Sequence, residues 1–311
     1  MTSSILSFTR IALACAALVG TGAVCADRAG ESAPPRASAA QTAIAPLSWT
    51  STGPLVHPVA DERHPIVSVK DPTVVYHEGK WHVFATTADT SGRWAMAYFN
   101  FRTWEEAPQA KPFHLDQNPS FAGYNCAPQV FYFRPQGKWY LIFQSPQPRF
   151  STTDNIADPD SWSAPQDFFD GTPKSVVQGW LDYWIVCDDT HAYLFFPDDH
   201  GRFYRSRTRI EDFPRGFDEP VVVMQETKAA DLFEGSCVYR IKDADRYLCL
   251  VECITLIDKG YTELSFYALL LLVCEKAEET KIYVVHTCIR MKAVNDRPWD
   301  PMPMIGEEGS E

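Results

Sequence analysis

The chain has 311 residues, of which 45% are hydrophobic and 13% aromatic, and its 28 Lys and Arg against 40 Asp and Glu give a formal net charge of −12. This hydrophobic content is enough for a folded core and excludes a disordered chain. The acidic balance argues against nucleic acid and against an anionic membrane surface as partners, because both attract basic faces. The length suits two average domains or one large all-β domain.

The first 26 residues have the pattern of a secretory signal peptide. Arg10 precedes an uncharged apolar run over residues 11–24, and small residues around Ala26 provide a cleavage point. The run is too short to span a bilayer. We therefore expect residues 1–26 to be removed, residues 27–46 to form a flexible lead-in rich in Ala, Ser and Pro, and the protein to be secreted and extracellular.

A unit of two short strands recurs along the body of the chain. An apolar strand, a polar turn and an aromatic strand follow from Asp71, Ala127, Asp182 and Glu234, so the units start 56, 55 and 52 residues apart. Such runs flanking Gly, Asn or Asp are typical of β-hairpins, and further short strands lie between the copies. About four strands per repeat predict an all-β fold of the β-propeller type. A β-sandwich is the alternative, which the even spacing disfavours.

Three of the four units begin with a carboxylate, namely Asp71, Asp182 and Glu234. The innermost strand of each propeller blade runs along the central axis, so equivalent strand starts gather at one mouth of the channel. A lone carboxylate at a strand start is usually a turn residue. Three that converge would raise one another's pKa and separate an acid from a base. This pattern predicts an acid/base hydrolase of an uncharged substrate, and paired carboxylates between aromatic walls are typical of glycosidases.

The sequence contains no G-x-S-x-G elbow, no H-E-x-x-H, no P-loop and no dinucleotide fingerprint. Its eight His show no metal-ligand spacing, and we interpret each as a surface or turn residue. The residues themselves therefore assign neither a metal site nor a cofactor.

Several longer strings match one family by their residues. They are Leu47–Leu55, Lys70–Val75, Lys80–Thr87, Met96–Phe101, Ala127–Phe133, Asp188-Asp189, Asp198-Asp199 and Asp231–Glu234. From about residue 47 to residue 253 the chain resembles the α-L-arabinofuranosidases of glycoside hydrolase family 62. The resemblance implies a five-bladed β-propeller that removes arabinofuranosyl side chains from plant cell-wall arabinoxylan with inversion of configuration.

The resemblance also implies roles for single residues. By position, Asp71 is similar to the general base that activates water, and Glu234 to the general acid that protonates the leaving xylan oxygen. Asp182 is similar to the third carboxylate, which holds the sugar and tunes the pKa of the acid. Lys70 matches a pocket residue. Gln129 is a candidate for the pocket rim, with a packing or strand role as the alternative.

After Cys253 the resemblance stops. Residues 254–311 carry an eleven-residue apolar run, Leu264–Cys274, without strand alternation. We expect 254–311 to be an aberrant tail, either a gene-model error or a divergent helical ending. The fourth and fifth blades are then incomplete, and the chain as written is expected to be inactive or poorly soluble. The family has a structural calcium site completed by a His of the last blade, and no residue here matches that His, so no metal ligand is predicted.

Two alternatives to an arabinoxylan hydrolase remain open. One is a carbohydrate-binding propeller without turnover, and the other is a hydrolase of a related clan that acts on arabinan or xylo-oligosaccharides. In each case we expect a monomer whose partner is a polysaccharide, with no nucleic acid and no membrane, and chemistry that requires no cofactor.

Overall fold

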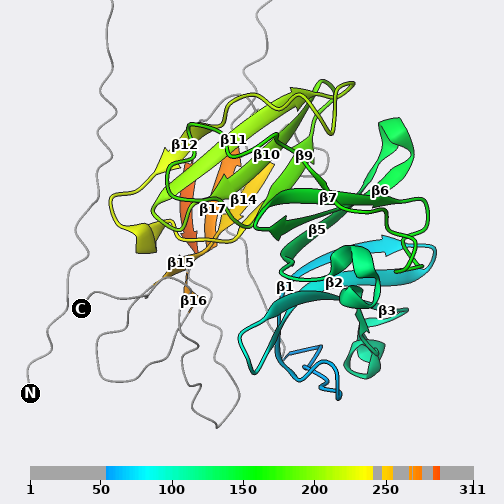
Figure 1. The fold of residues 1–311 in the computed structure, drawn as a ribbon. Helices are drawn as coiled ribbons and strands as arrows, with labels where there is room; N and C mark the ends of the chain where they lie inside the picture. The colour runs from blue at the N-terminus through cyan, green and yellow to red at the C-terminus, as the bar shows by residue number, and fades with distance from the viewer. Residues whose placement is uncertain (1–53, 241–246, 255–265, 268, 275–282, 288–311) are drawn as a thin grey trace, which may run out of the picture. The chain divides into compact units, whose positions relative to one another are not determined.

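The computed structural model describes residues 54–240, 247–254, 266–267, 269–274 and 283–287 (Figure 1). All regular structure in these ranges is β-strand or short 3-10 helix, so the all-β prediction is confirmed. The expected signal peptide, 1–26, and lead-in, 27–46, lie outside the described residues. In the part of the chain that is described, no helix has the length and apolar character needed to cross a membrane.

Four antiparallel sheets of four strands follow one another along the chain (Figure 1). The first contains β1 (Ile66–His77), β2 (Lys80–Asp89), β3 (Trp94–Phe101) and β4 (Phe113–His114), and the second β5 (Cys126–Phe133), β6 (Lys138–Ser145), β7 (Gln147–Thr153) and β8 (Gln166–Asp167). The third contains β9 (Trp184–Cys187), β10 (His191–Pro197), β11 (Arg202–Arg209) and β12 (Val221–Gln225). The fourth contains β13 (Ser236–Arg240), β14 (Tyr247–Val251), β17 (Leu269–Cys274) and β18 (Tyr283–Thr287).

Shorter elements connect or extend these sheets. The strands β15 (Cys253–Ile254) and β16 (Phe266–Tyr267) pair with each other. The 3-10 helices are η1 (Trp104–Gln109), η2 (Leu115–Gln117), η3 (Pro119–Phe121), η4 (Arg134–Gln136) and η5 (Ala229–Asp231). The predicted hairpin after Asp71 is present as β1 and β2, which pair from Ile66 with Asp89 to His77 with Lys80. Its two-residue turn has positive φ at Glu78 and Gly79, 47° and 76°, as the tight turns that match strand twist require.

The apolar cores lie between consecutive sheets. Side chains alternate between the two faces of a strand, so the neighbours Leu141 and Ile142 on β6 point to opposite sides, and both are fully buried. Each side of β6 therefore packs against a different neighbouring sheet. Each core contains residues from two consecutive sheets, such as Phe84 and Leu141 (sheets one and two), Ile142 and Phe196 (two and three), and Tyr193 and Val238 (three and four).

The first strands of the sheets, β1, β5, β9 and β13, are joined to one another in chain order. Each joint is a side chain bonded to the backbone of the next first strand: Thr73 to Val130 (3.1 Å), Gln129 to Ile185 (2.7 Å) and Trp184 to Val238 (2.8 Å). The three bridging residues occupy equivalent places, each two residues after the first residue of its unit. This repeated joint fixes the register in which the first strands, and the residues before them, meet.

The fourth sheet has more strands than the sequence led us to expect. Leu264–Cys274, interpreted as an aberrant or helical segment, contains β16 and β17, and β18 completes a four-stranded sheet. The helical alternative is therefore wrong for Leu269–Cys274, and the expectation of an incomplete fourth blade is corrected. An uninterrupted apolar run suits a strand covered on both faces, and its periodicity does not distinguish it from a buried helix. A fifth blade stays a prediction, because residues 288–311 lie outside the described residues.

Candidate active site

The residues that open the units share an unusual backbone conformation. Asp71, Ala127 and Asp182 have φ of 50°, 49° and 50°. Residues other than glycine rarely adopt such values. Register shifts between Lys70 and Thr73 and between Cys126 and Gln129 mark β-bulges at the first two positions. Strained backbone of this kind concentrates at functional sites.

The fourth unit begins one residue later than the sequence pattern suggested. Trp184 reaches Val238 as Gln129 reaches Ile185, which makes Gly235, with φ of 67°, the equivalent of Asp182. The last step is therefore 53 residues, from 182 to 235, and Glu234 occupies the place of Lys70. The prediction of three carboxylates at equivalent positions is corrected, because only Asp71 and Asp182 are equivalent.

The three predicted carboxylates nevertheless belong to one group. The N–H of Gly235, directly after Glu234, donates to Oδ2 of Asp182 at 2.8 Å. Lys70 Nζ lies 3.7 Å from Oδ2 of Asp71 and 4.5 Å from the ring centre of Trp94. The pKa of Lys70 is raised, because the charges of Asp71, Glu234, Asp182 and Glu252 outweigh the desolvation that would lower it. A single cation thus faces carboxylates from three sheets.

Glu252 is the member of this group that the sequence reasoning missed. It directly follows β14, its N–H donates to the carbonyl of Glu234 at 2.8 Å, and its carbonyl accepts from Phe233 at 3.0 Å. Its side chain lies against Gly235, where an added Cβ would come 2.8 Å from Cγ of Glu252. The only signal for it in the sequence is one acidic residue at the end of an apolar strand.

The environment raises the pKa of three of the carboxyls. Desolvation is the main cause for Glu234, whose pKa is raised to about 7, with Lys70 opposing and Glu252 adding to the shift. Desolvation and the charges of Glu234 and Asp71 raise the pKa of Asp182 to about 7, against the N–H of Gly235. Desolvation and the charges of Asp182 and Asp71 likewise raise the pKa of Glu252 to about 7.

Asp71 is treated differently by its surroundings. Its pKa is also raised, mainly by desolvation, but the ammonium of Lys70 and a hydrogen bond from Thr86 oppose the rise because they stabilise the ionised form. Thr86 also accepts a hydrogen bond from the N–H of Ala127 at 2.7 Å, so its hydroxyl is held in place. Asp71 is therefore suited to remain a carboxylate while Glu234 holds a proton, which is how paired carboxyls divide base and acid roles.

Gln129 bonds to the neighbouring first strand. Its side chain is 4% exposed. Its amide N–H donates to the carbonyl of Ile185 at 2.7 Å, and its amide oxygen accepts from the N–H of Ile185 at 2.6 Å. These two bonds support the strand role for Gln129, and its place at the pocket rim stays a prediction.

Two histidines are placed differently from the expectation. His82 and His114 are buried, 1% and 4% exposed, so the interpretation of every His as a surface or turn residue is wrong for this pair. His82 bonds to the hydroxyl of Tyr98 at 2.7 Å and packs inside the first sheet.

The described residues do not fit the calcium site that the resemblance implies. Ca²⁺ takes about six to eight oxygen ligands. Within the described ranges, one group of three His, Cys, Asp or Glu has its donor atoms within 4.8 Å of one another, and it holds two imidazoles and one carboxylate, Asp61, His64 and His114. Thr73 and Gln129, polar residues of the first strands, already bond to the neighbouring backbone. No catalytic step is therefore assigned to a calcium ion.

The chain is similar in sequence and fold to proteins whose family is known. The chain is 43% identical over 212 residues to the alpha-L-arabinofuranosidase C of Cellvibrio japonicus, which covers 67% of this chain and 32% of the relative. The chain thus spans about a third of the length of that curated relative. The catalytic domain of the Coprinopsis cinerea family 62 alpha-L-arabinofuranosidase is 40% identical with a TM-score of 0.68, covering 74% of this chain and 71% of that one.

A third relative extends the comparison. The crystal structure of a family 62 hydrolase in complex with xylotriose is 40% identical with a TM-score of 0.67, covering 81% of this chain and 76% of that one. The model of the glycosyl hydrolase family 62 matches residues 48–271, beyond the limit at residue 253 that the motifs suggested. The fold is accordingly of the propeller type, and the chain belongs to glycosyl hydrolase family 62.

Proposed function

We propose that this chain is a secreted α-L-arabinofuranosidase that removes arabinofuranosyl side chains from arabinoxylan with inversion of configuration. Its membership of family 62 and its 43% identity to an alpha-L-arabinofuranosidase support the activity. The relative seen with xylotriose supports a xylan-like backbone as the polymer. The observation that carries the proposal is the group of carboxyls around Lys70 in which Glu234 has a pKa raised to about 7 and Asp71 is paired with a cation.

In this mechanism Glu234 is the general acid. Its carboxyl gives its proton to the glycosidic oxygen as the bond between that oxygen and the anomeric carbon breaks. A pKa of about 7 keeps a large fraction of Glu234 protonated at neutral and mildly acidic pH, which a general acid needs. At pH values where Glu252 is itself ionised, its charge helps to hold the proton on Glu234, because it disfavours a second negative charge nearby.

Asp71 is the general base in the same proposal. Its carboxylate takes a proton from the water that attacks the anomeric carbon from the face opposite the leaving group, so the configuration inverts. Lys70 and Thr86 favour the ionised form that this role requires. Asp182, which accepts the N–H of Gly235 directly after Glu234, orients the sugar. After product release, exchange with solvent restores the proton on Glu234 and removes that on Asp71.

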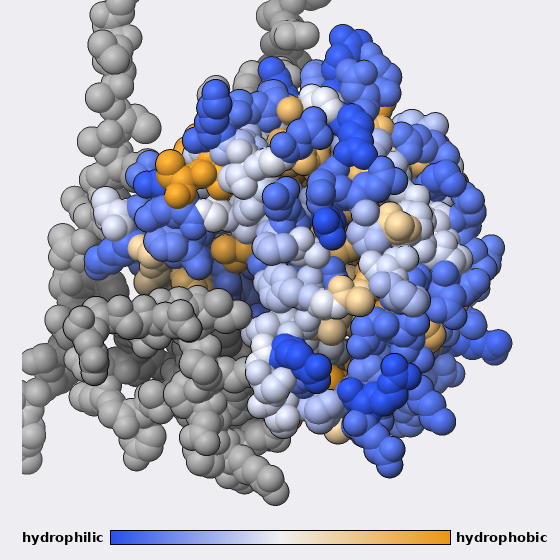
Figure 2. Space-filling view, viewed as in Figure 1, coloured by the Kyte–Doolittle hydropathy of each residue, from blue (hydrophilic) through white to orange (hydrophobic). Residues whose placement is uncertain are grey.

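The localisation and the state of assembly are also proposals. The signal-like segment over residues 1–26 supports secretion. Figure 2 shows a mainly hydrophilic face with small, scattered hydrophobic patches among the coloured residues, which supports a monomer with no membrane contact. The acidic charge of −12 disfavours nucleic acid.

The expectation of an inactive chain depended on missing strands. Two of those strands are β17 and β18 of the fourth sheet. We therefore propose turnover for the chain as it stands, and the carbohydrate-binding propeller and the arabinan or xylo-oligosaccharide hydrolase become outcomes of the test.

The test compares substrates and variants of the full chain. Arabinose release is measured from arabinoxylan, arabinan and xylo-oligosaccharides, for the wild type and for Glu234→Gln and Asp71→Asn. The proposal predicts release from arabinoxylan, with a loss of roughly 10²–10⁴-fold in each variant. Binding of arabinoxylan without release would favour the binding propeller, and preference for arabinan would favour the related clan.

A further inference from the structure

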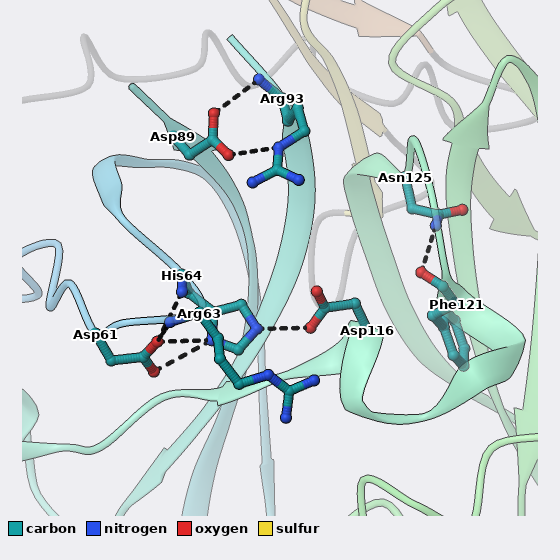
Figure 3. A network of polar contacts seen from close by, with 8 residues as sticks. All are labelled: Asp61, Arg63, His64, Asp89, Arg93, Asp116, Phe121 and Asn125. Carbon is teal, nitrogen blue, oxygen red and sulfur yellow. Dashed lines mark hydrogen bonds and ion pairs between the residues drawn. The ribbon is translucent and has the colours of Figure 1, made fainter. Parts of the chain in front are cut away.

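A cluster of ionisable side chains outside the carboxylate group lies beside the first sheet. His64 stands between two carboxylates (Figure 3). Its Nδ1 lies 3.1 Å from both carboxylate oxygens of Asp61, and its Nε2 lies 3.0 Å from Oδ1 of Asp116. Asp61 and His64 belong to the segment before β1, whereas Asp116 lies in η2. The cluster therefore joins two segments far apart in the sequence.

His114 completes the cluster. Its ring stacks on that of His64, with centroids 3.8 Å apart and planes 12° apart. His114 is 4% exposed, and within the described ranges no hydrogen bond engages its ring. Its ring nitrogens are therefore not engaged by another described residue.

The donor atoms are spaced for a small tetrahedral cation. Asp61, His64 and His114 each offer one ligand atom, and these atoms lie within 4.8 Å of one another. Ligands about 2.0–2.1 Å from a tetrahedral Zn²⁺ are roughly 3.3 Å apart. The 3.1 Å between Asp61 and Nδ1 of His64 is already close to that spacing. The His114 ring stacks nearly parallel on that of His64, so it has to turn out of the stack for one of its nitrogens to point at the ion.

The chemistry of the set also points to zinc. Two imidazoles and one carboxylate suit Zn²⁺, whereas Ca²⁺ and Mg²⁺ prefer oxygen ligands alone. A zinc-binding His usually donates its other ring N–H to a carboxylate, which fixes the tautomer and the ring orientation. Asp116 stands at that place on Nε2 of His64. The Asp61 side chain is 54% exposed, which leaves a route for the ion and a position for a water ligand.

We propose that Asp61, His64 and His114 bind one Zn²⁺ ion, with Asp116 orienting His64 from the second layer. The bound ion fastens the segment that precedes β1 to the end of β4, where His114 lies. Because the folded chain alone brings these segments together, Zn²⁺ stabilises it by mass action and raises its Tm. The zinc site takes no part in the hydrolytic reaction, and the two proposals are tested independently.

The test uses the full chain after removal of metals with a chelator. Calorimetric titration with Zn²⁺, and the visible spectrum with Co²⁺ as a substitute, should show a tetrahedral site at one ion per chain. Asp61→Asn and His114→Phe should remove it, and Asp116→Asn should weaken Zn²⁺ binding by roughly 10–100-fold. His57→Phe, in the same segment but outside the cluster, is the control and should bind as the wild type does.

Asp61→Asn is chosen because it removes the carboxylate ligand without disturbing the local fold. Its amide oxygen can still accept the N–H groups of Arg63 and His64, which Oδ1 of Asp61 accepts at 2.8 and 2.7 Å, so the local turn is kept. Zn²⁺ affinity that is unchanged in both Asp61→Asn and His114→Phe would overturn the proposal. The absence of any binding by the metal-free wild type would overturn it equally.

Discussion

The N–H of Gly235 donates to Oδ2 of Asp182 at 2.8 Å, which ties the strand that follows the proposed acid to a carboxylate of the preceding sheet. On its other side Gly235 meets Glu252, since an added Cβ would lie 2.8 Å from Cγ and 3.0 Å from Cδ of that residue. The contacts of Gly235 thus fix the relative positions of Asp182, Glu234 and Glu252. Its lack of a side chain is required both by φ of 67° and by this close approach.

We predict that Gly235→Ala lowers both stability and activity. The positive φ alone costs about 1–2 kcal/mol with a side chain present, and the contact with Glu252 displaces a site carboxylate. Urea unfolding and arabinose release measure the two effects. The matched control is Gly92→Ala, since Gly92 has φ of 77° but nothing within 4 Å of an added Cβ. Equal loss of activity in both variants would contradict the placement of Glu252 in the site.

Glu252→Gln should shift the pH dependence of the reaction. The negative charge of Glu252 raises the pKa of Glu234, so removing it lowers that pKa. Activity requires protonated Glu234, and the alkaline limb of the kcat/KM profile should therefore move to lower pH, with kcat at the optimum largely kept. A profile identical to that of the wild type would show that Glu252 does not act on the acid.

Stability should fall as pH rises across the neutral range. Asp182, Glu234 and Glu252 have folded-state pKa values raised to about 7, from ordinary values of 3.8, 4.5 and 4.5. The folded chain therefore binds more protons than the unfolded chain between about pH 4.5 and 7. This contribution favours folding below that window and is lost as pH rises through 7.

Glu234→Gln provides the check on that sign. The amide cannot ionise, so the variant should unfold with a free energy about 1 kcal/mol higher than the wild type at pH 8, a figure that allows for solvent screening. At pH 5 the two should be nearly equal. Urea denaturation at both pH values measures this, and a variant less stable than the wild type at pH 8 would contradict the raised pKa.

Gln129→Leu separates the two roles that the sequence allowed for this residue. The change leaves the N–H and carbonyl of Ile185 without the partners they have at 2.6 and 2.7 Å, which costs about 1–3 kcal/mol for each buried group. We predict a large loss of stability. The exposed Gln117→Leu is the control and should change little. A raised KM with unchanged stability would instead assign Gln129 to the pocket.

The sequence predicted more of the fold than of the site. The spacing of Asp71, Ala127 and Asp182 located three sheets, because the same strand start, with the same positive φ, recurs at each. Glu234 was aligned one residue early, because the equivalent place is taken by Gly235, and matching carboxylates by type does not reveal a backbone conformation. Glu252 was missed because it becomes part of the site only when β13 pairs with β14.

Other features depend on contacts between distant segments. His64 and His114 are fifty positions apart, so no ligand spacing in the sequence indicates them. Leu269–Cys274 reads as an apolar run without alternation, and pairing with its neighbours makes it a strand. In both cases the deciding information lies in contacts between distant segments rather than in local pattern.

The most direct test of the central claim follows the anomer of arabinose released from arabinoxylan by proton NMR, for the wild-type chain and for Glu234→Gln. Inversion by Asp71-activated water predicts that the β-anomer forms first in the wild type. The variant should release sugar from arabinoxylan at least 10²-fold more slowly, while an aryl arabinofuranoside, whose leaving group needs little protonation, should be affected much less. Wild-type rates in Glu234→Gln on arabinoxylan, or an initial α-anomer, would contradict the account.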